Sequence, residues 1–379
     1  MKGFKEYYKN KYVWVFIALA IFYQVLMLGI FLPSYHHADE NHAMTIAFID
    51  NDESALSESV IAGIEESLPY EIKDLSKEEA QAAIEDLSLQ LLVEIPEGYG
   101  DKMLQGNTPE INYYYNGRLA TSMLGEVQAV TVQIEQSLAA QARVAQNINI
   151  LTELGVPYEQ AQKMIERSEA PIKHNVEVSD PLPRGLYGSM ICMFMPLGAY
   201  VFGLMGTAIL SMAANENKRR FSQLRLSVYQ KIAAIIAALL VPTVGMLINY
   251  CFGVELSLLQ IAGLWVTVAL TAFISVQLSG IFMRFIGDAG TFLNVALLLV
   301  QIISSGAILA REQMLGFFSI ISVISPMYYA VAAMKNFLFG QGVWSFTLVL
   351  ALMAVILAVI DLICAHVQDY RKKRYCEQG

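Results

Sequence analysis

A glycine turn is the first feature of this 379-residue chain whose residues could do chemistry. Gly98 and Gly100 flank Tyr99 after the apolar run of residues 89–95, and a short amphipathic segment follows. Glycine turns in this position place backbone amides around phosphate groups in nucleotide-binding proteins. A phosphate loop would continue with Lys and then Ser or Thr, and no such pair follows here. We therefore interpret both glycines as turn residues that connect a strand to a helix, and we expect Tyr99 to pack against that helix.

Histidines and hydroxyl groups offer two further chemistries. His36, His37 and His42 follow the pattern HHxxxxH, whose imidazoles could bind a metal ion. Their place just after a long apolar segment favours a juxtamembrane linker instead, so we predict no metal site. The Ser, His and Asp residues between positions 34 and 185 show no nucleophile elbow or protease pattern. We predict no catalytic residue and no bound cofactor.

Charged residues also lie inside or beside apolar segments, where charge usually marks function. Asp361 lies within the last apolar run, one or two turns before the basic tail, which favours snorkelling of its carboxylate to the interface. Arg284 and Asp288 are four residues apart and could pair across a turn. Neither arrangement supplies the several acids at matched depth that a proton relay needs.

Composition places most of the chain in a membrane. It is 55% hydrophobic and only 16% charged, whereas soluble proteins carry about 25% charged residues. The second apolar run contains Gly198, Gly203 and Gly206, which would allow close helix packing. The predicted fold is a polytopic α-helical membrane protein with six transmembrane helices, each of roughly the 20 residues or more that a crossing needs. These runs cover residues 12–32, 186–213, 232–252, 256–285, 289–309 and 343–366.

The distribution of charge predicts the topology. Residues 34–185 hold 26 acidic and 9 basic groups, a net charge of −17, and the remainder carries +8. With six spans, the basic groups near the N-terminus, those between positions 218 and 231, and those of the tail all fall on one side. The positive-inside rule makes that side cytoplasmic. We predict a multi-pass protein of a bacterial plasma membrane, with both termini cytoplasmic and residues 34–185 extracellular.

Residues 34–185 have the pattern of a small α/β extracytoplasmic domain between the first and second spans. Strand-like and helical segments alternate, and the sequence SKEE at Ser76 is a capping box. We predict strands at 44–49, 70–75, 89–95 and 110–115, and helices at 55–68, 76–87, 118–154 and 157–169. The other predicted regions are an amphipathic cytoplasmic elbow (1–11), the first span (12–33), spans two to six (186–366) and a basic cytoplasmic tail (367–379).

Three stretches resemble a known family. AFIDNDESALSESVIAGIEES and EEAQAAIEDLSLQLLVEIPEGYGDKMLQGNTPEINYYYNG resemble the extracytoplasmic lobe of ABC transporter permeases of the type-2 exporter class. GDAGTFLNVALLLVQIISSGAILAREQMLGFFSIISVISPMYYAVAAMK resembles the last third of the subgroup with phage-infection-protein-like and drug-exporter permeases. The resemblance implies the permease subunit of an ATP-driven exporter, which moves an amphipathic or hydrophobic substrate out of the cell.

The resemblance also implies partners. The chain contains no P-loop motif, so ATP and Mg²⁺ are expected on a separate cytosolic ABC ATPase, and this chain is not expected to be an enzyme. A second permease chain, identical or different, and membrane lipids are the other expected partners. No nucleic acid is expected.

Two regions are candidates for function within that family. The basic segment 214–231 (ANENKRRFSQLRLSVYQK) would couple to the ATPase, and an ordinary positive-inside loop is the alternative. The candidate coupling residues are Glu216, Lys218, Arg219, Arg220 and Arg225. Residues 310–326 would form a re-entrant segment that closes the outer end of the pathway, and a plain extracellular loop with an amphipathic helix is the alternative. The candidate gate residues are Ser304, Ser305, Gly306 and Pro326.

A function of another class remains open at this level. The chain could be a non-transporting membrane surface protein, such as a secretion-system subunit or a phage-adsorption factor, that acts through its extracellular lobe. Association with an ATPase distinguishes the two hypotheses, because only the exporter needs one.

Overall fold

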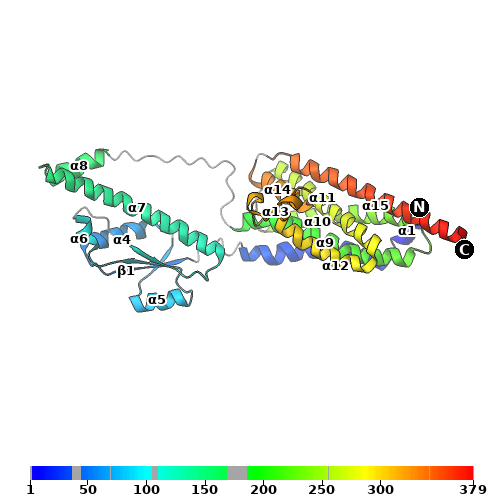
Figure 1. Cartoon of the computed structure of the whole chain (residues 1–379), viewed down its shortest axis with the longest axis horizontal. Helices are drawn as coiled ribbons and strands as arrows, with labels where there is room; N and C mark the ends of the chain where they lie inside the picture. Colours follow the sequence, from blue (N-terminus) through cyan, green and yellow to red (C-terminus); the bar gives the residue numbers. More distant parts are fainter. Residues whose placement is uncertain are drawn as a thin grey trace. The chain divides into compact units, whose positions relative to one another are not determined.

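The chain divides into two compact units (Figure 1). A helical unit combines Met1–Glu40 with Val178–Gly379, and an α/β unit comprises Asn41–Glu177. The computed structural model describes residues 2–35, 44–68, 70–104, 110–168, 186–254, 256–340 and 342–378. An α/β domain inserted after the first apolar helix confirms the predicted fold class. His36, His37, His42 and the segment 105–109 lie outside the described residues.

Among the residues that the structure describes, five helices of the helical unit are long and apolar enough to cross a membrane. Their backbone groups are satisfied within each helix, as lipid requires. They are α2 (Lys11–Leu26), continued by the π-helical η1 (Met27–Phe31), α9 (Leu186–Asn217), α10 (Gln223–Cys251), α11 (Leu258–Ile286) and α15 (Ser345–Gln378). The shorter elements are α1 (Lys2–Tyr7), η2 (Gly287–Ala289), α12 (Gly290–Ser304), η3 (Arg311–Gln313), α13 (Gly316–Ser322) and α14 (Pro326–Phe339).

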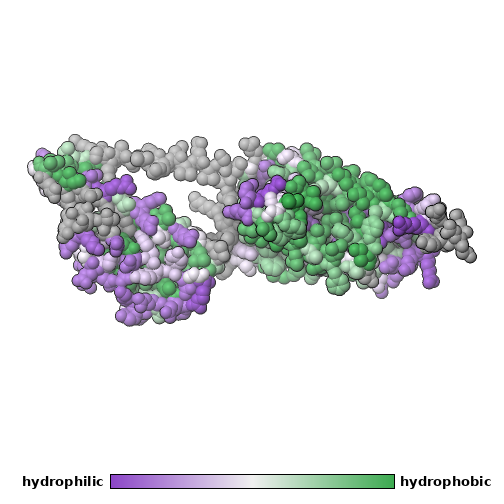
Figure 2. Space-filling model, viewed as in Figure 1, coloured by the Kyte–Doolittle hydropathy of each residue, from purple (hydrophilic) through white to green (hydrophobic). Residues whose placement is uncertain are grey.

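The start of α2, the turn between α9 and α10, and the last part of α15 meet at one end of the bundle, which we call the terminal end. There Glu6 pairs with Arg220 at 2.8 Å, and the carboxylate of Asp369 accepts a hydrogen bond from the backbone N–H of Gln223 at 2.7 Å. Figure 2 shows apolar residues over the side of this unit that is in view, with hydrophilic residues gathered at the terminal end.

The segment between α11 and α15 must return from the terminal end to the opposite end, because α15 starts there. The predicted fifth span over residues 289–309 is shorter than expected: α12 has 15 residues and covers about 22 Å. A crossing helix needs about 20 residues. The helices α13 and α14 follow, bent by 72° to each other, as in a broken span or a re-entrant loop. With that pair counted as one span, the described part of the unit has six candidate spans.

Close helix packing at the glycines of α9 is confirmed. The Cβ of an alanine at Gly203 would overlap the hydroxyl of Ser275 on α11. At Gly206 it would lie 2.8 Å from the ring of Phe16 on α2, and Gly198 approaches α2 equally closely. Without side chains at these positions, α9 contacts both neighbours along its length.

The α/β unit is built on a four-stranded sheet of order β2-β1-β3-β4. Strands β1 (Thr45–Asp50), β2 (Glu71–Lys73) and β3 (Leu91–Ile95) are parallel, and β4 (Asn112–Tyr114) is antiparallel to β3. Three of these strands lie within the predicted segments, and β1 extends one residue beyond its predicted segment, to Asp50. The crossover from β1 to β2 and the crossover from β2 past β1 to β3 run in opposite directions along the sheet. Because such parallel connections are right-handed, their helices lie on opposite faces of the sheet.

Two cores cover the two faces of this sheet. Leu91, Val93 and Ile95 of β3 belong to a core with side chains of α4 (Ala55–Ser67), α6 (Tyr99–Leu104) and α7 (Thr121–Glu153). Leu92 faces the other way, towards α5 (Lys77–Glu85). Figure 1 shows α5 on one side of the sheet and α4, α6 and α7 on the other.

The longest helix of the α/β unit extends past the sheet. With 33 residues, α7 is about 50 Å long, and α8 (Tyr158–Ser168) packs back on it. Ile148 of α7 contacts Ala161 and Ile165 of α8. The two predicted helices at 118–154 and 157–169 are thus present as a helical hairpin.

Candidate functional site: the terminal end of the helical bundle

The five candidate coupling residues lie together at the terminal end. Only residues 218–222 are non-helical, because α9 extends to Asn217 and α10 starts at Gln223. The predicted loop 214–231 is therefore mostly helix. All five candidate side chains are exposed: Glu216 in the last turn of α9, Lys218, Arg219 and Arg220 in the connecting turn, and Arg225 in the first turn of α10.

The elbow helix α1 packs against this turn and the start of α10. The hydroxyl of Tyr8 donates to the backbone carbonyl of Tyr229 over 3.1 Å. Burial raises the pKa of Tyr8 to about 12, so this hydroxyl keeps its proton at neutral pH. Asn10 donates to the carboxylate of Glu216 over 2.7 Å. Gly3 lets the helix approach closely, because a Cβ there would lie 2.9 Å from the ring of Phe221.

The last helix caps the first turn of α10. The two carboxylate oxygens of Asp369 accept hydrogen bonds from the backbone N–H groups of Gln223 and Leu224, at 2.7 and 2.9 Å. Ser222 accepts a further one from Arg225. A negative group at a helix N-terminus satisfies unpaired N–H groups and interacts favourably with the helix dipole. A displacement of the 218–222 turn would therefore act on α9, α10 and α15 together.

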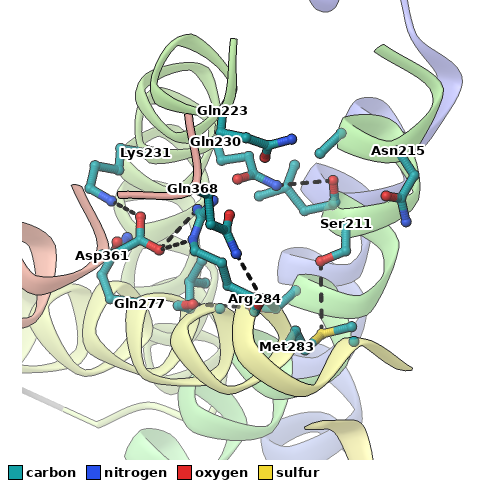
Figure 3. A pocket seen from close by; sticks show the side chains of 16 residues that line it. Ser211, Asn215, Gln223, Gln230, Lys231, Gln277, Met283, Arg284, Asp361 and Gln368 are labelled. Carbon is teal, nitrogen blue, oxygen red and sulfur yellow. Dashed lines mark hydrogen bonds and ion pairs between the residues drawn. The ribbon is translucent and has the colours of Figure 1, made fainter. Parts of the chain in front are cut away.

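Behind the turn lies a buried ion cluster that the sequence did not reveal. The carboxylate of Asp361 is bound on one side by Lys231 of α10 and on the other by Arg284 of α11 (Figure 3). Arg284 Nε and Nη2 each lie 3.0 Å from Asp361 Oδ1, and the hydroxyl of Ser227 donates to Oδ2 over 2.6 Å.

One interpretation from the sequence is corrected by this cluster. Asp361 does not snorkel, since only 7% of its side chain is exposed. Arg284 pairs with Asp361. The predicted Arg284–Asp288 pair stays a prediction, because the side chain of Asp288 lies outside the described part of the chain. The available signal was depth, because the three residues lie at similar depths in three different spans. Lys231, Arg284 and Asp361 are each within about three turns of the terminal end of their candidate spans, which are Gln223–Cys251, Leu258–Ile286 and Ser345–Arg371.

A polar cavity of about 300 Å³ adjoins the cluster. It lies among α9, α10, α11 and α15 (Figure 3). Its lining includes Ser211, Gln230, Gln277 and Gln368 as well as the three charged residues of the cluster. Polar lining between four apolar helices is expensive in lipid, which marks this place as a candidate binding or coupling site.

The candidate gate residues lie between the last residue of α12, Ser304, and the first residue of α14, Pro326. Ser304 is buried, and its hydroxyl has no hydrogen-bond partner among the described residues. Ser305 donates to a backbone carbonyl, and Gly306 adopts a φ of 73°, which favours glycine. Lys335 donates to the carbonyl of Gly306 over 3.0 Å. Pro326 is the buried first residue of α14.

Gln301 connects these elements and was not found from the sequence. Its side chain is 2% exposed, donates to the hydroxyl of Tyr200 on α9 and accepts from the backbone N–H of Met327 over 3.4 Å. One amide thus ties α9, α12 and α14 together. A glutamine in the middle of an apolar run was the available signal.

In the α/β unit, the glycine turn at Gly98–Gly100 binds a carboxylate of the same chain. Asp52, in the turn after β1, accepts a hydrogen bond from the backbone N–H of Gly100 over 3.0 Å. Hydrogen bonds from Ser54 and from the backbone at Gly98–Gly100 lower the pKa of Asp52. Tyr99 is buried in the core beside α7. Within the described ranges, His, Cys, Asp and Glu form no cluster that could hold a metal ion.

Comparison with known proteins agrees with this geometry. The family model described as ABC-2 family transporter protein matches residues 11–363, which is most of the chain. No curated protein matches the chain. Membrane domains of this family lack an ATPase site, and in such systems a partner ABC ATPase hydrolyses ATP. The chain is thus a multi-pass permease subunit, and it belongs to the ABC-2 family of transporter proteins.

Proposed function

We propose that this permease works in an exporter of the phage-infection-protein-like and drug-exporter subgroup, and moves an amphipathic or hydrophobic substrate out of the cell. The terminal end faces the cytoplasm and binds a separate ABC ATPase. The α/β unit lies outside the cell, and the chain pairs with a second permease chain, identical or different.

One observation carries this proposal. At the terminal end, the exposed basic turn 218–222 is joined to α1 through the Glu6–Arg220 ion pair and to α15 through Asp369. A partner that binds the turn therefore acts on α9 and α10, which the turn connects, and on α15, which contributes Asp369. An ATPase must move such spans to drive transport. The excess of basic groups on this side of the chain supports its cytoplasmic placement.

Opening of the outer end is proposed to occur around Gln301. Its hydrogen bonds to Tyr200 and to the N-terminus of α14 hold the segment 304–326 against α9. The other end of α9, at Asn217, leads directly into the turn 218–222. A movement of α9 that starts at this turn would break or remake the hydrogen bonds of Gln301. Ser304, Ser305, Gly306 and Pro326 then belong to the outer gate.

Charge reversal in the turn tests the coupling. We expect the double variant Lys218→Glu, Arg219→Glu to lower association with the native ATPase by about tenfold and to abolish permease-dependent ATP hydrolysis, because both side chains are exposed and available to a partner. Lys5→Glu, Lys9→Glu makes the same change of charge at the same end and serves as the control. Association and hydrolysis are measured on membranes from the native host.

Two results would refute the proposal. An unchanged ATPase association in the turn variant would remove the turn from the interface. Purification of the wild-type chain without any Walker-containing partner would favour the surface-protein hypothesis, in which the α/β unit alone carries the function.

A further inference from the structure

The ion cluster has unequal charges. Lys231 and Arg284 supply two positive charges, and Asp361 supplies one negative charge. The side chains of Lys231 and Arg284 are only 12% and 11% exposed. An uncompensated charge in such surroundings is costly, and a bound counter-ion removes that cost.

Donor groups remain free on both cations. Lys231 donates to Ser227 and Asp361, which leaves one of its three N–H bonds. Arg284 uses Nε and Nη2 for Asp361, so Nη1 has no partner among the described residues. A guanidinium with a free edge beside an ammonium group is suited to phosphate oxygens.

A second observation points into the same cavity. Gln277 lines it, is only 4% exposed, and its side-chain amide makes no hydrogen bond to any described residue. Because Gln277 lines the cavity, the two N–H bonds of its amide are available to a molecule bound there. The nearby hydroxyl of Ser211 points at the sulfur of Met283 (Figure 3), which is a weak acceptor.

The space suffices for a ligand of this kind. The cavity measures about 300 Å³, and a single water needs about 10–15 Å³. Two acidic side chains that the structure describes at the terminal end are engaged elsewhere: Asp369 caps α10, and Glu216 accepts a hydrogen bond from Asn10.

We propose that this cavity binds the phosphate group of an anionic ligand, with Lys231, Arg284 and Gln277 as the donors. The ligand is either a lipid headgroup or a soluble phosphate. Binding at this place does not require an ATPase, so the inference stands apart from the proposed exporter function and can fail without it.

The test uses the full-length chain, purified in a phosphate-free maltoside detergent. Inorganic phosphate is titrated in one arm, at an ionic strength matched with sodium chloride, and phosphatidylglycerol in mixed micelles is titrated in the other. The readout is the thermal unfolding midpoint from tryptophan fluorescence, since Trp14, Trp265 and Trp344 all lie in the helical unit. A ligand that binds only the folded state raises this midpoint in a saturable way.

Three variants make the result specific. Lys231→Met leaves a neutral Arg284–Asp361 pair and is expected to weaken binding at least about tenfold, the usual loss for a hydrogen bond to a charged group. Lys9→Met, at an exposed position outside the cavity, should bind like the wild type. Gln277→Leu keeps all three charges and should also weaken binding of the phosphate ligand. This variant therefore tests the proposal even if Lys231→Met does not fold.

The outcomes separate the sources of the phosphate. A response to phosphatidylglycerol alone identifies a lipid headgroup, and a response to inorganic phosphate identifies a soluble ligand. No response in either arm overturns the proposal. Equal responses of the wild type and Gln277→Leu, or of the wild type and a folded Lys231→Met, overturn it as well.

Discussion

The guanidinium of Arg284 donates to the carboxylate of Asp361 over 3.0 Å, across 77 positions of sequence. This buried pair joins the last turn of α11 to the interior of α15, and Lys231 adds α10 from the other side. Three spans are therefore fixed to one another immediately behind the turn that we propose to bind the ATPase. The predictions below test this connection and the local features that support both units.

Neutralising Asp361 should lower the free energy of unfolding more than neutralising Lys231. Asp361→Asn leaves two buried positive charges without compensation and is expected to lower the free energy of unfolding by about 3–5 kcal/mol. Lys231→Met leaves one carboxylate for one guanidinium and should cost less. Thermal unfolding of the purified chain measures both variants. Equal losses would show that the cluster is not held together by its charge balance.

Close packing of α9 on α11 should make Gly203 intolerant of a methyl group. Gly203→Ala places its Cβ against Ser275 and is expected to destabilise the helical unit by about 1–3 kcal/mol. Gly280→Ala is the matched control on α11, because its Cβ would lie 3.8 Å from the nearest atom, the Cγ2 of Thr207. The yield of folded protein and its unfolding midpoint report the difference. Similar behaviour of the two variants would contradict the packing described for α9.

The glycine turn at Gly98–Gly100 should become less stable when the carboxylate of Asp52 is removed. Asp52→Ala deletes the acceptor for the backbone N–H of Gly100, a loss of about 1 kcal/mol by analogy with helix caps. Amide hydrogen exchange of residues 98–104 should therefore accelerate about fivefold. Asp74→Ala, at an exposed position of the same unit, should leave it unchanged. An unaltered rate in Asp52→Ala would separate this acid from the stability of the turn.

Acid should destabilise the α/β unit through Glu94. Hydrogen bonds from Lys77 at 2.6 Å and Asn51 at 2.7 Å lower its pKa below the usual value near 4.5. A carboxyl whose pKa is lower in the folded state contributes stability that is complete above the unfolded pKa. That contribution is lost as the pH falls through the folded value.

Hydrogen exchange of β3, corrected for the intrinsic rate at each pH, measures this dependence between pH 7 and pH 3. The loss of protection at low pH should shrink in Glu94→Gln. It should persist in Glu97→Gln, where the side chain is exposed. If both variants behave alike, Glu94 is not the titrating group.

The sequence by itself determined the elements of both units. Apolar run length located the five long helices, and alternation of strand and helix patterns located the sheet strands to within a few residues. The capping box at Ser76 and the small residues at Gly203 and Gly206 were also correctly interpreted. These features depend on hydropathy, periodicity and residue size within one segment, so no knowledge of the neighbouring segments was needed.

The tertiary structure alone decided which groups meet. Asp361 was expected to reach for the interface because its own helix offers no partner, whereas α10 and α11 bring cations to the same depth. Asp52 reaches the glycine turn because β1 and β3 are parallel neighbours and end at the same edge of the sheet. Such pairs depend on the packing order and rotation of elements that are far apart in the chain. Hydropathy constrains which face of a helix is buried, but it does not say which helix will cover that face.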